Sequence, residues 1–347
     1  MYRKVSVIGG GSWGTTVAKV VGENYARKGK EEKVTLWIYE EKVGGRNLTE
    51  IINMDHVNTK YLPGVSLPEN VQALSSVEQA VEGAEIVLLT VPHEFLDGIL
   101  NSMKGKISKS AILVILTKGF FFKGDKMELI SENIKKSMGV RVCTLMGANI
   151  AGDVANCLLS ECTLGYEDAE ARDAVLELFE SPYFKVNPVL DSGCVEVCGT
   201  LKNVVAIGCG IVAGNKHGVN TLAAVIRNGL LEMVRFCDQF IKKASSPEAV
   251  PRVFFESCGL ADLIVTCTSG RNFKFSKLAA EKGISISKIE TEEMNGQKLQ
   301  GYSTIKELIQ FMGLNKIEKE YPFLYAISIS ATTDLSADKI LQAIQEK

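Results

Sequence analysis

The chain has 347 residues, of which 46% are hydrophobic, and a formal net charge of −2 from 39 basic and 41 acidic residues. This length accommodates two ordinary domains, and the balanced charge without a basic tail predicts no nucleic-acid partner. The sequence contains no uncharged apolar run of about 18 residues, so it predicts no membrane-spanning segment. The N-terminal segment does not have the layout of a signal peptide.

The first half of the chain alternates between short apolar runs and segments with helical spacing. The apolar runs are KVSVIGG (4–10), KVTLWIY (33–39), EIVLLTVP (85–92), AILVILTKG (111–119) and RVCTLMGAN (141–149). Continuous apolar strands separated by helices are typical of a parallel sheet that is covered on both faces. The pattern predicts an α/β fold whose N-terminal domain, residues 1–190, is a doubly wound, Rossmann-like parallel sheet.

The second half has helical spacing over 193–213 and 220–243 and few strand candidates. We place the change near Pro188–Asp191 and expect a C-terminal all-α, substrate-binding domain at residues 191–347. One of its helical segments, EVCGTLKNVVAIGCG (196–210), is almost wholly apolar or small, yet it contains Lys202 and Asn203. Burying an ammonium group is costly unless it is paired, so Lys202 is either an ion-paired structural residue or a functional one.

The first apolar run leads into Gly9, Gly11 and Gly14, in G-x-G-x-x-G spacing, directly before a helical segment. At such a turn the first glycine makes the tight bend, and the second lets a pyrophosphate approach the backbone. The third lets the helix pack closely on the strand. The spacing therefore predicts dinucleotide binding at the N-terminus of this helix.

Tyr39, Glu40 and Glu41 follow the second apolar run, where the adenosine end of such a ligand is expected. We expect Tyr39 to lie against the adenine and one carboxylate to accept a ribose hydroxyl. A carboxylate here disfavours a 2′-phosphate, which favours NAD over NADP. The alternative is that both glutamates only begin the next helix or loop.

The other strand ends carry further candidates at the sheet edge where ligands bind in α/β folds. Phe95 is expected to wall the nicotinamide. Lys118 is either a cation that faces the ligand or a solvated strand-end lysine. His93 is interpreted as a structural residue rather than a catalytic acid.

In the helical half, Asp262 and Thr266 share one face if their segment is a helix. The following SGRN ends that segment and presents Arg271, whose planar fork is suited to a phosphate. The alternative is a structural arginine–aspartate pair. Further on, the polar loop NGQKLQG (295–301) carries Lys298 and Gln300, and by itself it is typical of an ordinary surface loop.

The nine cysteines show no C-x-x-C or Cys/His metal spacing. Cys194 and Cys198 are four residues apart in a helical segment, but no second pair or nearby histidine supports a metal site. We interpret them as packed thiols and expect no metal and a reducing, cytoplasmic compartment.

Several motifs occur together in the order and approximate spacing of one enzyme family. They are GGGSWG, VPHEF, LTKG, LMGANIA, VEVCGTLKNVVAIG, GLADLIVTCTSGRN and NGQKLQG. On these motifs the chain resembles the soluble, eukaryotic-type NAD-dependent glycerol-3-phosphate dehydrogenases to about residue 310. The resemblance implies the reversible reduction of dihydroxyacetone phosphate by NADH to sn-glycerol 3-phosphate, in a cytoplasmic homodimer.

The resemblance also implies a role for each matching residue. Lys202 supplies the proton to the developing alkoxide as general acid/base, with Lys118 as a neighbouring cation and Asp262 orienting it. Asn203, Asp262 and Thr266 form the catalytic polar network, and Lys118, Arg271 and Asn272 bind the substrate. The cofactor is lined by Gly9, Gly10, Gly11, Ser12, Trp13, Gly14, Tyr39, Phe95, Lys118, Ala151, Arg271, Lys298 and Gln300.

Two other interpretations stay open. A related two-domain dehydrogenase acting on a 3-hydroxy acid is disfavoured by Arg271–Asn272. A cofactor-binding sensor without turnover is disfavoured because Lys202 and Arg271 are both present. The chain departs from the family pattern at three positions, which are Lys216, His217 and Leu222. In addition, the segment KGFFFKGDK (118–126) is unusually aromatic.

Overall fold

The computed structural model describes residues 4–241, 252–294 and 297–346. The chain forms two compact units. The first consists of Met1–Thr117, Ile130–Leu145 and Asn149–Ser192, and the second of Lys118–Leu129, Met146–Ala148 and Gly193–Lys347. The functional division into residues 1–190 and 191–347 stays a prediction.

The first unit is built on an eight-stranded sheet with the order β14-β13-β12-β9-β8-β1-β2-β7. β1 pairs in parallel with β2 and β8, and the pairs β2–β7, β8–β9, β9–β12 and β13–β14 are parallel as well. The five predicted strands are confirmed, but β7, β13 and β14 were not predicted. The strands are β1 (Val5–Ile8), β2 (Val34–Trp37), β7 (Val71–Leu74), β8 (Ile86–Leu89), β9 (Ile112–Ile115), β12 (Arg141–Met146), β13 (Ser160–Gly165) and β14 (Phe184–Val189).

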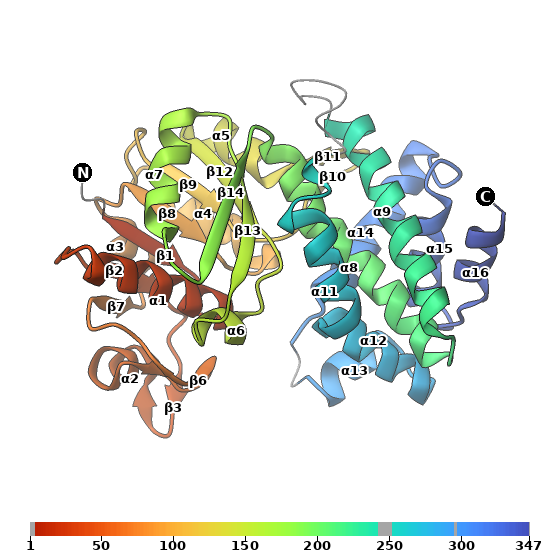
Figure 1. Cartoon of the computed structure of the whole chain (residues 1–347), viewed down its shortest axis with the longest axis horizontal. Coiled ribbons are helices and arrows are strands. Elements are labelled where there is room, and N and C mark those ends of the chain that lie inside the picture. The colour runs from red at the N-terminus through yellow and green to blue at the C-terminus, as the bar shows by residue number, and fades with distance from the viewer. Residues whose placement is uncertain (1–3, 242–251, 295–296, 347) are drawn as a thin grey trace. The chain divides into compact units, whose positions relative to one another are not determined.

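Helices cover both faces of this sheet, as the apolar strands require. α1 contacts β1, β2, α6 and α7, whereas α3 contacts β1, β2, β7 and α4. In Figure 1, α1 and α7 lie in front of the sheet and α3 and α4 behind it. The helices are α1 (Ser12–Arg27), α2 (Leu48–Asp55), α3 (Val77–Val81), α4 (His93–Met103), α5 (Ile130–Met138), α6 (Ala151–Ala155) and α7 (Ala169–Phe179). Two short hairpins, β3 (Lys42–Val43) with β4 (Arg46–Asn47) and β5 (Val57–Asn58) with β6 (Leu62–Ser66), complete the unit.

Over its described residues from 193 onward and in the segment 118–129, the second unit is helical apart from one hairpin (Figure 1). Both helices predicted for it are confirmed, although residues 242–243 of the second lie outside the described residues. A π-helical turn, Ser257–Ala261, leads directly into α11. The helices are α8 (Ser192–Gly214), α9 (Val219–Ile241), α11 (Asp262–Ser269), α12 (Arg271–Lys282), α13 (Ile286–Glu292), α14 (Gln300–Asn315), α15 (Pro322–Thr332) and α16 (Asp338–Gln345).

Helix α8 is the core of the second unit. Its glycines permit close contact, since a Cβ at Gly210 would lie 1.9 Å from Ser276 Oγ and one at Gly208 would lie 2.7 Å from the Ile327 side chain. α8 is long and apolar enough to cross a membrane, but 94% of its most apolar window is buried inside the fold. It is therefore explained as the core helix of a globular unit.

The aromatic segment after Lys118 has a packing role. It forms the hairpin of β10 (Phe121–Lys123) and β11 (Lys126–Glu128). Phe120 is fully buried and stacks on Phe236 with ring centroids 6.0 Å apart, and Phe122 contacts Phe311 at 5.5 Å. These rings anchor the segment in the second unit, and they hold Lys118 there.

One expectation about the cysteines is wrong. Cys194 is not a packed thiol but forms a disulfide with Cys237, which lies 43 residues further along the chain. The packing of α8 against α9 brings the two Cα atoms to 5.9 Å, within the range that a disulfide spans. Cys198 is buried and stays outside the disulfide.

Breaking this disulfide is expected to lower the free energy of unfolding by roughly 3–4 kcal/mol, because the unfolded chain regains the entropy of an open loop. Urea denaturation of the Cys194→Ser variant beside wild type measures this effect, with Cys157→Ser as the exposed-thiol control. Equal midpoints for Cys194→Ser and wild type, or nine alkylated thiols in unreduced, unfolded wild-type protein, would contradict it.

Candidate active site

The glycine loop of the first unit has the geometry that its spacing predicts. Gly9 has a φ of +124°, and a Cβ there would lie 2.6 Å from Thr90 Oγ1. A Cβ at Gly14 would lie 1.7 Å from the Gly9 carbonyl oxygen, so α1 can approach β1 only with glycine at this position. A Cβ at Gly11 would meet nothing within 4 Å. The first and third glycines serve packing, and the second leaves open space for a ligand.

The loop is also held by hydrogen bonds and suited to an anion. The Thr90 hydroxyl donates to the Gly9 carbonyl at 2.8 Å, and Asn58 Nδ2 donates to the Gly10 carbonyl at 3.0 Å. α1 begins at Ser12 and has no acidic residue in its first turn, which leaves its N-terminal dipole available to a phosphate. The backbone here fits the pyrophosphate of a dinucleotide.

The side chains of Ser12 and Trp13 are already engaged within the protein. Ser12 Oγ donates to the Tyr61 carbonyl at 2.6 Å, and the half-buried Trp13 ring lies 6.3 Å from that of Phe184. Ala151 begins α6, and its carbonyl accepts a hydrogen bond from Thr16 Oγ1 at 3.2 Å.

Tyr39 and Phe95 are large aromatic side chains that are 75% and 60% exposed, which leaves their ring faces open to a ligand. The two glutamates after Tyr39 have partners in the protein. Glu40 accepts hydrogen bonds from the backbone and hydroxyl of Thr49 in the first turn of α2. Glu41 pairs with Lys60 and accepts a hydrogen bond from the Tyr61 hydroxyl at 2.6 Å. A ribose role for either carboxylate stays a prediction.

The contacts of Lys202 in the second unit explain why a lysine lies in a buried helix. Lys202, 2% exposed, forms an ion pair with Oδ1 of Asp262, which is 3% exposed, and its ammonium donates to Thr266 Oγ1 at 3.0 Å. The Thr266 hydroxyl in turn donates to Asp262 Oδ1 at 3.2 Å. Asp262 and Thr266 share a face of α11, as predicted. The other oxygen, Asp262 Oδ2, is buried and has no hydrogen-bond partner within the part of the chain that the structure describes.

Lys118 is the second cation of this cluster. Its pKa is lowered from 10.5 to about 7, mainly by burial and also by the charge of Lys202, and Asp262 opposes this shift. Its backbone carbonyl accepts a hydrogen bond from Gln300 Nε2. The interpretation of Lys118 as a solvated strand-end lysine is therefore disfavoured.

Asparagines and an arginine extend the cluster. Asn272 Nδ2 donates to Asn203 Oδ1 at 2.9 Å, and Asn272 Oδ1 accepts a hydrogen bond from the Gly301 backbone at 3.1 Å. Arg271 is exposed at the first position of α12 and donates to Gln297 Oε1 at 2.9 Å. The structure thus brings Lys202, Asp262, Thr266 and Lys118 together and joins Asn203 to Asn272, whereas Lys298 bonds Glu290 instead.

Three polar residues that hold these segments were missed by sequence reasoning. Thr200 Oγ1 accepts a hydrogen bond from the Gly119 backbone at 2.9 Å, and Ser257 Oγ accepts one from the Ala148 backbone at 3.2 Å. Glu290 bonds Lys298 and the Leu299 backbone. Thr200 was visible as a polar residue within an apolar helix, but Glu290 stands among other charged residues and carries no such signal.

A glycine loop between a strand and a helix, and a buried lysine–aspartate pair beside a second lysine, define a dinucleotide-dependent oxidoreductase. Sequence models of the NAD-dependent glycerol-3-phosphate dehydrogenase N-terminus and C-terminus match residues 4–172 and 191–342. The chain belongs to the NAD-dependent glycerol-3-phosphate dehydrogenase family. The match extends beyond residue 310, where the sequence resemblance ended.

Named relatives and solved structures agree with this membership. The chain is 43% identical to the cytoplasmic NAD⁺-dependent glycerol-3-phosphate dehydrogenase of Rattus norvegicus, over 94% of this chain and 92% of the relative. It is also 43% identical to that of Drosophila virilis, over 99% and 98%. The glycerol-3-phosphate dehydrogenase structure from Saccharomyces cerevisiae has a TM-score of 0.88 at 37% identity and covers 99% of this chain and 100% of its own. Both the NAD dependence and the enzyme class that the sequence predicted are confirmed.

Proposed function

We propose that Lys202 acts as the general acid/base when this NAD-dependent enzyme interconverts dihydroxyacetone phosphate and sn-glycerol 3-phosphate. The observation that carries the proposal is the buried ion pair of Lys202 with Asp262, which leaves Asp262 Oδ2 without a partner among the described residues. A buried ion pair contributes little to stability by itself, so its presence favours a chemical role. Thr266 and Asp262 fix the direction in which the Lys202 ammonium points.

The proton transfer follows from this geometry. NAD supplies or accepts the hydride when it is bound. As negative charge develops on the substrate C2 oxygen, the Lys202 ammonium donates a proton to that oxygen, and in the reverse direction neutral Lys202 removes it. Asp262 pairs with the Lys202 ammonium before transfer, and its buried Oδ2, which has no partner among the described residues, is an acceptor for a substrate hydroxyl. Lys118 adds a second positive charge beside the developing alkoxide.

Arg271 and Asn272 are proposed to bind the substrate phosphate. Both stand in the first turn of α12, whose leading N–H groups lack partners within the helix and favour an anion. The guanidinium of Arg271 is able to contact two phosphate oxygens at once. Asn203, which follows Lys202 in α8, accepts a hydrogen bond from Asn272 and holds it in place. This contact gives Asn203 a role in the proposed substrate site.

The cofactor role of the first unit rests on backbone geometry. Gly9 and Gly14 give the loop its close packing, and Gly11, where a Cβ would meet nothing within 4 Å, lies directly before the N-terminus of α1. Gly10, Ser12 and Trp13 contribute mainly through the backbone of the same turn. The remaining proposed contacts to NAD come from Tyr39, Phe95, Lys118, Ala151, Arg271, Lys298 and Gln300.

The first experiment is the loss of NADH absorbance with dihydroxyacetone phosphate, run beside NADPH and a panel of 3-oxo acids. We expect oxidation of NADH with dihydroxyacetone phosphate and little with NADPH or the oxo acids. A protein that binds NADH but leaves dihydroxyacetone phosphate unchanged would contradict the substrate assignment. Turnover of an oxo acid instead would favour the 3-hydroxy acid dehydrogenase alternative.

The pH dependence is expected to report Lys118. Its pKa of about 7 means that its positive charge is lost as the pH rises through that value, whereas the unfolded chain keeps the proton up to about 10.5. The cost of burying this charge therefore falls as the pH rises between these values. We expect kcat/KM for dihydroxyacetone phosphate to decline above about pH 7, because kcat/KM reports ionisations of the free enzyme.

The Lys118→Arg variant, which stays charged throughout, is expected to lose this alkaline limb. Initial rates are measured at low substrate concentration between about pH 6.5 and 9. In this range the substrate phosphate is mostly dianionic. A limb of unchanged position in Lys118→Arg would assign the ionisation to another group.

We propose that the enzyme acts as a homodimer in the cytoplasm. The cytoplasmic part is supported by the rat and Drosophila relatives, which are named cytoplasmic, and the homodimer is what the family resemblance implies. Light scattering of the purified protein and imaging of a tagged chain test the two parts of this proposal separately.

A further inference from the structure

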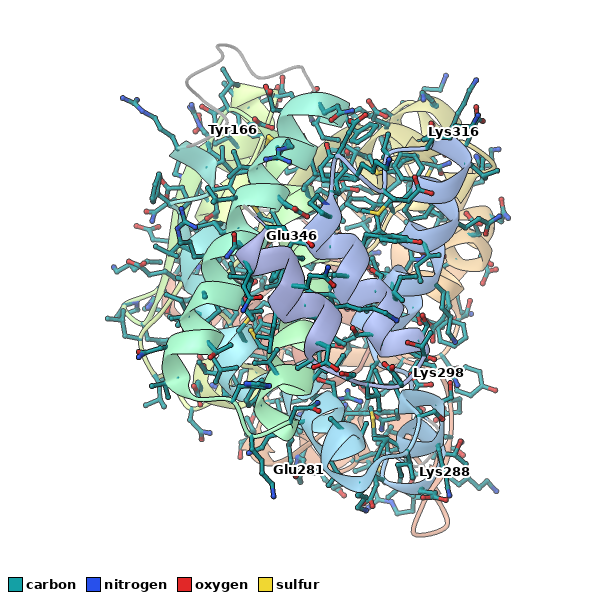
Figure 2. All side chains as sticks on the ribbon, turned by 90° about the vertical axis from the view of Figure 1, so that its right-hand side faces the viewer. Tyr166, Glu281, Lys288, Lys298, Lys316 and Glu346 are labelled. Carbon is teal, nitrogen blue, oxygen red and sulfur yellow. A yellow bond between two sulfur atoms is a disulfide. The ribbon has the colours of Figure 1, made fainter. Side chains whose placement is uncertain are left out.

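Glu290 is a buried carboxylate with two partners. It lies on α13, with its side chain 2% exposed. Its Oε1 accepts a hydrogen bond from the Leu299 backbone at 2.8 Å, and its Oε2 accepts one from Lys298 Nζ at 3.1 Å. The Lys298 side chain is 56% exposed and lies at the surface of the second unit (Figure 2). One carboxylate therefore holds two successive residues of the segment 297–301.

Three residues of the segment 297–301 form hydrogen bonds with residues of the proposed substrate site. Gln297 accepts the hydrogen bond from Arg271, and Gln300 donates to the Lys118 carbonyl. The Gly301 backbone donates to Asn272 Oδ1. Gly301 is tightly packed, since a Cβ there would lie 2.5 Å from the Asn203 carbonyl oxygen. A shift of the segment would therefore move the partners of Arg271 and Lys118.

The charge of Glu290 is as important as its shape. A buried carboxylate must be hydrogen-bonded and paired to offset its lost hydration, and here the Leu299 N–H and the Lys298 ammonium do this. A glutamine in the same place would still accept the Leu299 hydrogen bond. Its amide NH₂ would then face the Lys298 ammonium, which places two donors together without an acceptor.

We propose that Glu290 is a positioning residue of this active site: its carboxylate sets the register of residues 297–300 and, through Gln297 and Gln300, the placement of Arg271 and Lys118. This inference rests on the proposed function, because it assumes that Arg271 and Lys118 bind the substrate. Glu290 itself acts only through these neighbours.

The test compares Glu290→Gln with Glu292→Gln, which removes an exposed carboxylate from the same helix. We expect Glu290→Gln to lower kcat/KM for dihydroxyacetone phosphate by about 10- to 100-fold, mainly through a higher KM, because the groups that bind the substrate are misplaced. The melting temperature is expected to change little, and Glu292→Gln is expected to match wild type. The loss should be much smaller with glyceraldehyde, which carries no phosphate for Arg271 to bind.

A double-mutant cycle with Gln297→Ala separates positioning from general destabilisation. If Glu290 acts through Gln297, the Glu290→Gln substitution is expected to cost much less in the Gln297→Ala background than in wild type. Fully additive effects on kcat/KM would overturn the proposal. So would equal losses with dihydroxyacetone phosphate and glyceraldehyde, or a Glu290→Gln enzyme with wild-type constants.

Glu290→Asp, which keeps the charge, is the second variant. We expect it to recover part of the lost kcat/KM, and a failure of both variants to fold would overturn the proposal by making Glu290 a folding residue. The wild-type assay distinguishes the two levels of inference. An inactive wild type removes the proposed function, whereas an active wild type with unaffected Glu290 variants removes only the positioning role.

Discussion

The Lys202→Ala variant is expected to reduce dihydroxyacetone phosphate with a kcat lower by roughly 10³-fold or more, while it still binds NADH. The loss has two sources: no proton donor remains for the alkoxide, and a positive charge beside it is gone. NADH binding is expected to persist because the glycine loop lies in the first unit and shares no residue with the Lys202 cluster. Stopped-flow absorbance with saturating NADH measures the rate, and fluorescence titration measures the binding.

A stability control is needed for Lys202→Ala. The substitution leaves the carboxylate of Asp262 buried and unpaired, which is expected to cost about 3–5 kcal/mol of stability. The double variant Lys202→Ala, Asp262→Asn removes this unpaired charge, so it should recover most of the stability without recovering turnover. A fully active Lys202→Ala enzyme would return Lys202 to a structural role and make Lys118 the next candidate for the proton donor.

Arg271→Ala is expected to lower kcat/KM for dihydroxyacetone phosphate by roughly 10²- to 10³-fold, as expected when one partner of a hydrogen-bonded charge pair is removed. Lysine at this position should recover only part of the loss, because a point charge does not reproduce the planar fork of arginine. The Arg271→Lys and Arg271→Ala enzymes are to be compared by steady-state kinetics with dihydroxyacetone phosphate and with glyceraldehyde.

The comparison with glyceraldehyde carries the assignment of Arg271. If Arg271 binds the phosphate, its removal should affect turnover of glyceraldehyde much less than that of dihydroxyacetone phosphate. Arg172→Ala, which removes an arginine from α7 of the first unit, is the matched control and is expected to behave as wild type. An equal loss with both substrates would assign Arg271 to the cofactor or to the fold.

Much of the fold was readable because its signals are local. The run before Gly9 predicted β1, and the glycine spacing predicted the turn into α1, since a strand, a tight bend and a helix start each depend on neighbouring residues. β13 and β14 were missed. Their exposed and polar positions, such as Glu161 and Lys185, interrupt the continuous apolar run that identifies a buried strand.

The site was predictable to a different extent in its two halves. Lys202 was conspicuous as a charge in an apolar helix, and the spacing of Asp262 and Thr266 placed both on one helix face. That these residues meet was implied only by the family resemblance, because Lys202 and Thr266 are 64 positions apart. Glu290 carried no signal at all, since its role depends on its burial and on its contact with the segment that follows α13.

The sequence by itself determined the two kinds of architecture, the dinucleotide loop at Gly9–Gly14 and the family to which the enzyme belongs. Only the tertiary structure decided which partners the charged and sulfur-containing side chains have. In the structure Lys202 pairs with Asp262, Cys194 is bonded to Cys237, and Glu40 accepts a hydrogen bond from the backbone of Thr49 in α2. The reason is physical: strand, turn and helix preferences act between near neighbours in the chain. The partner of a buried charge or thiol is set instead by which distant segments pack against it.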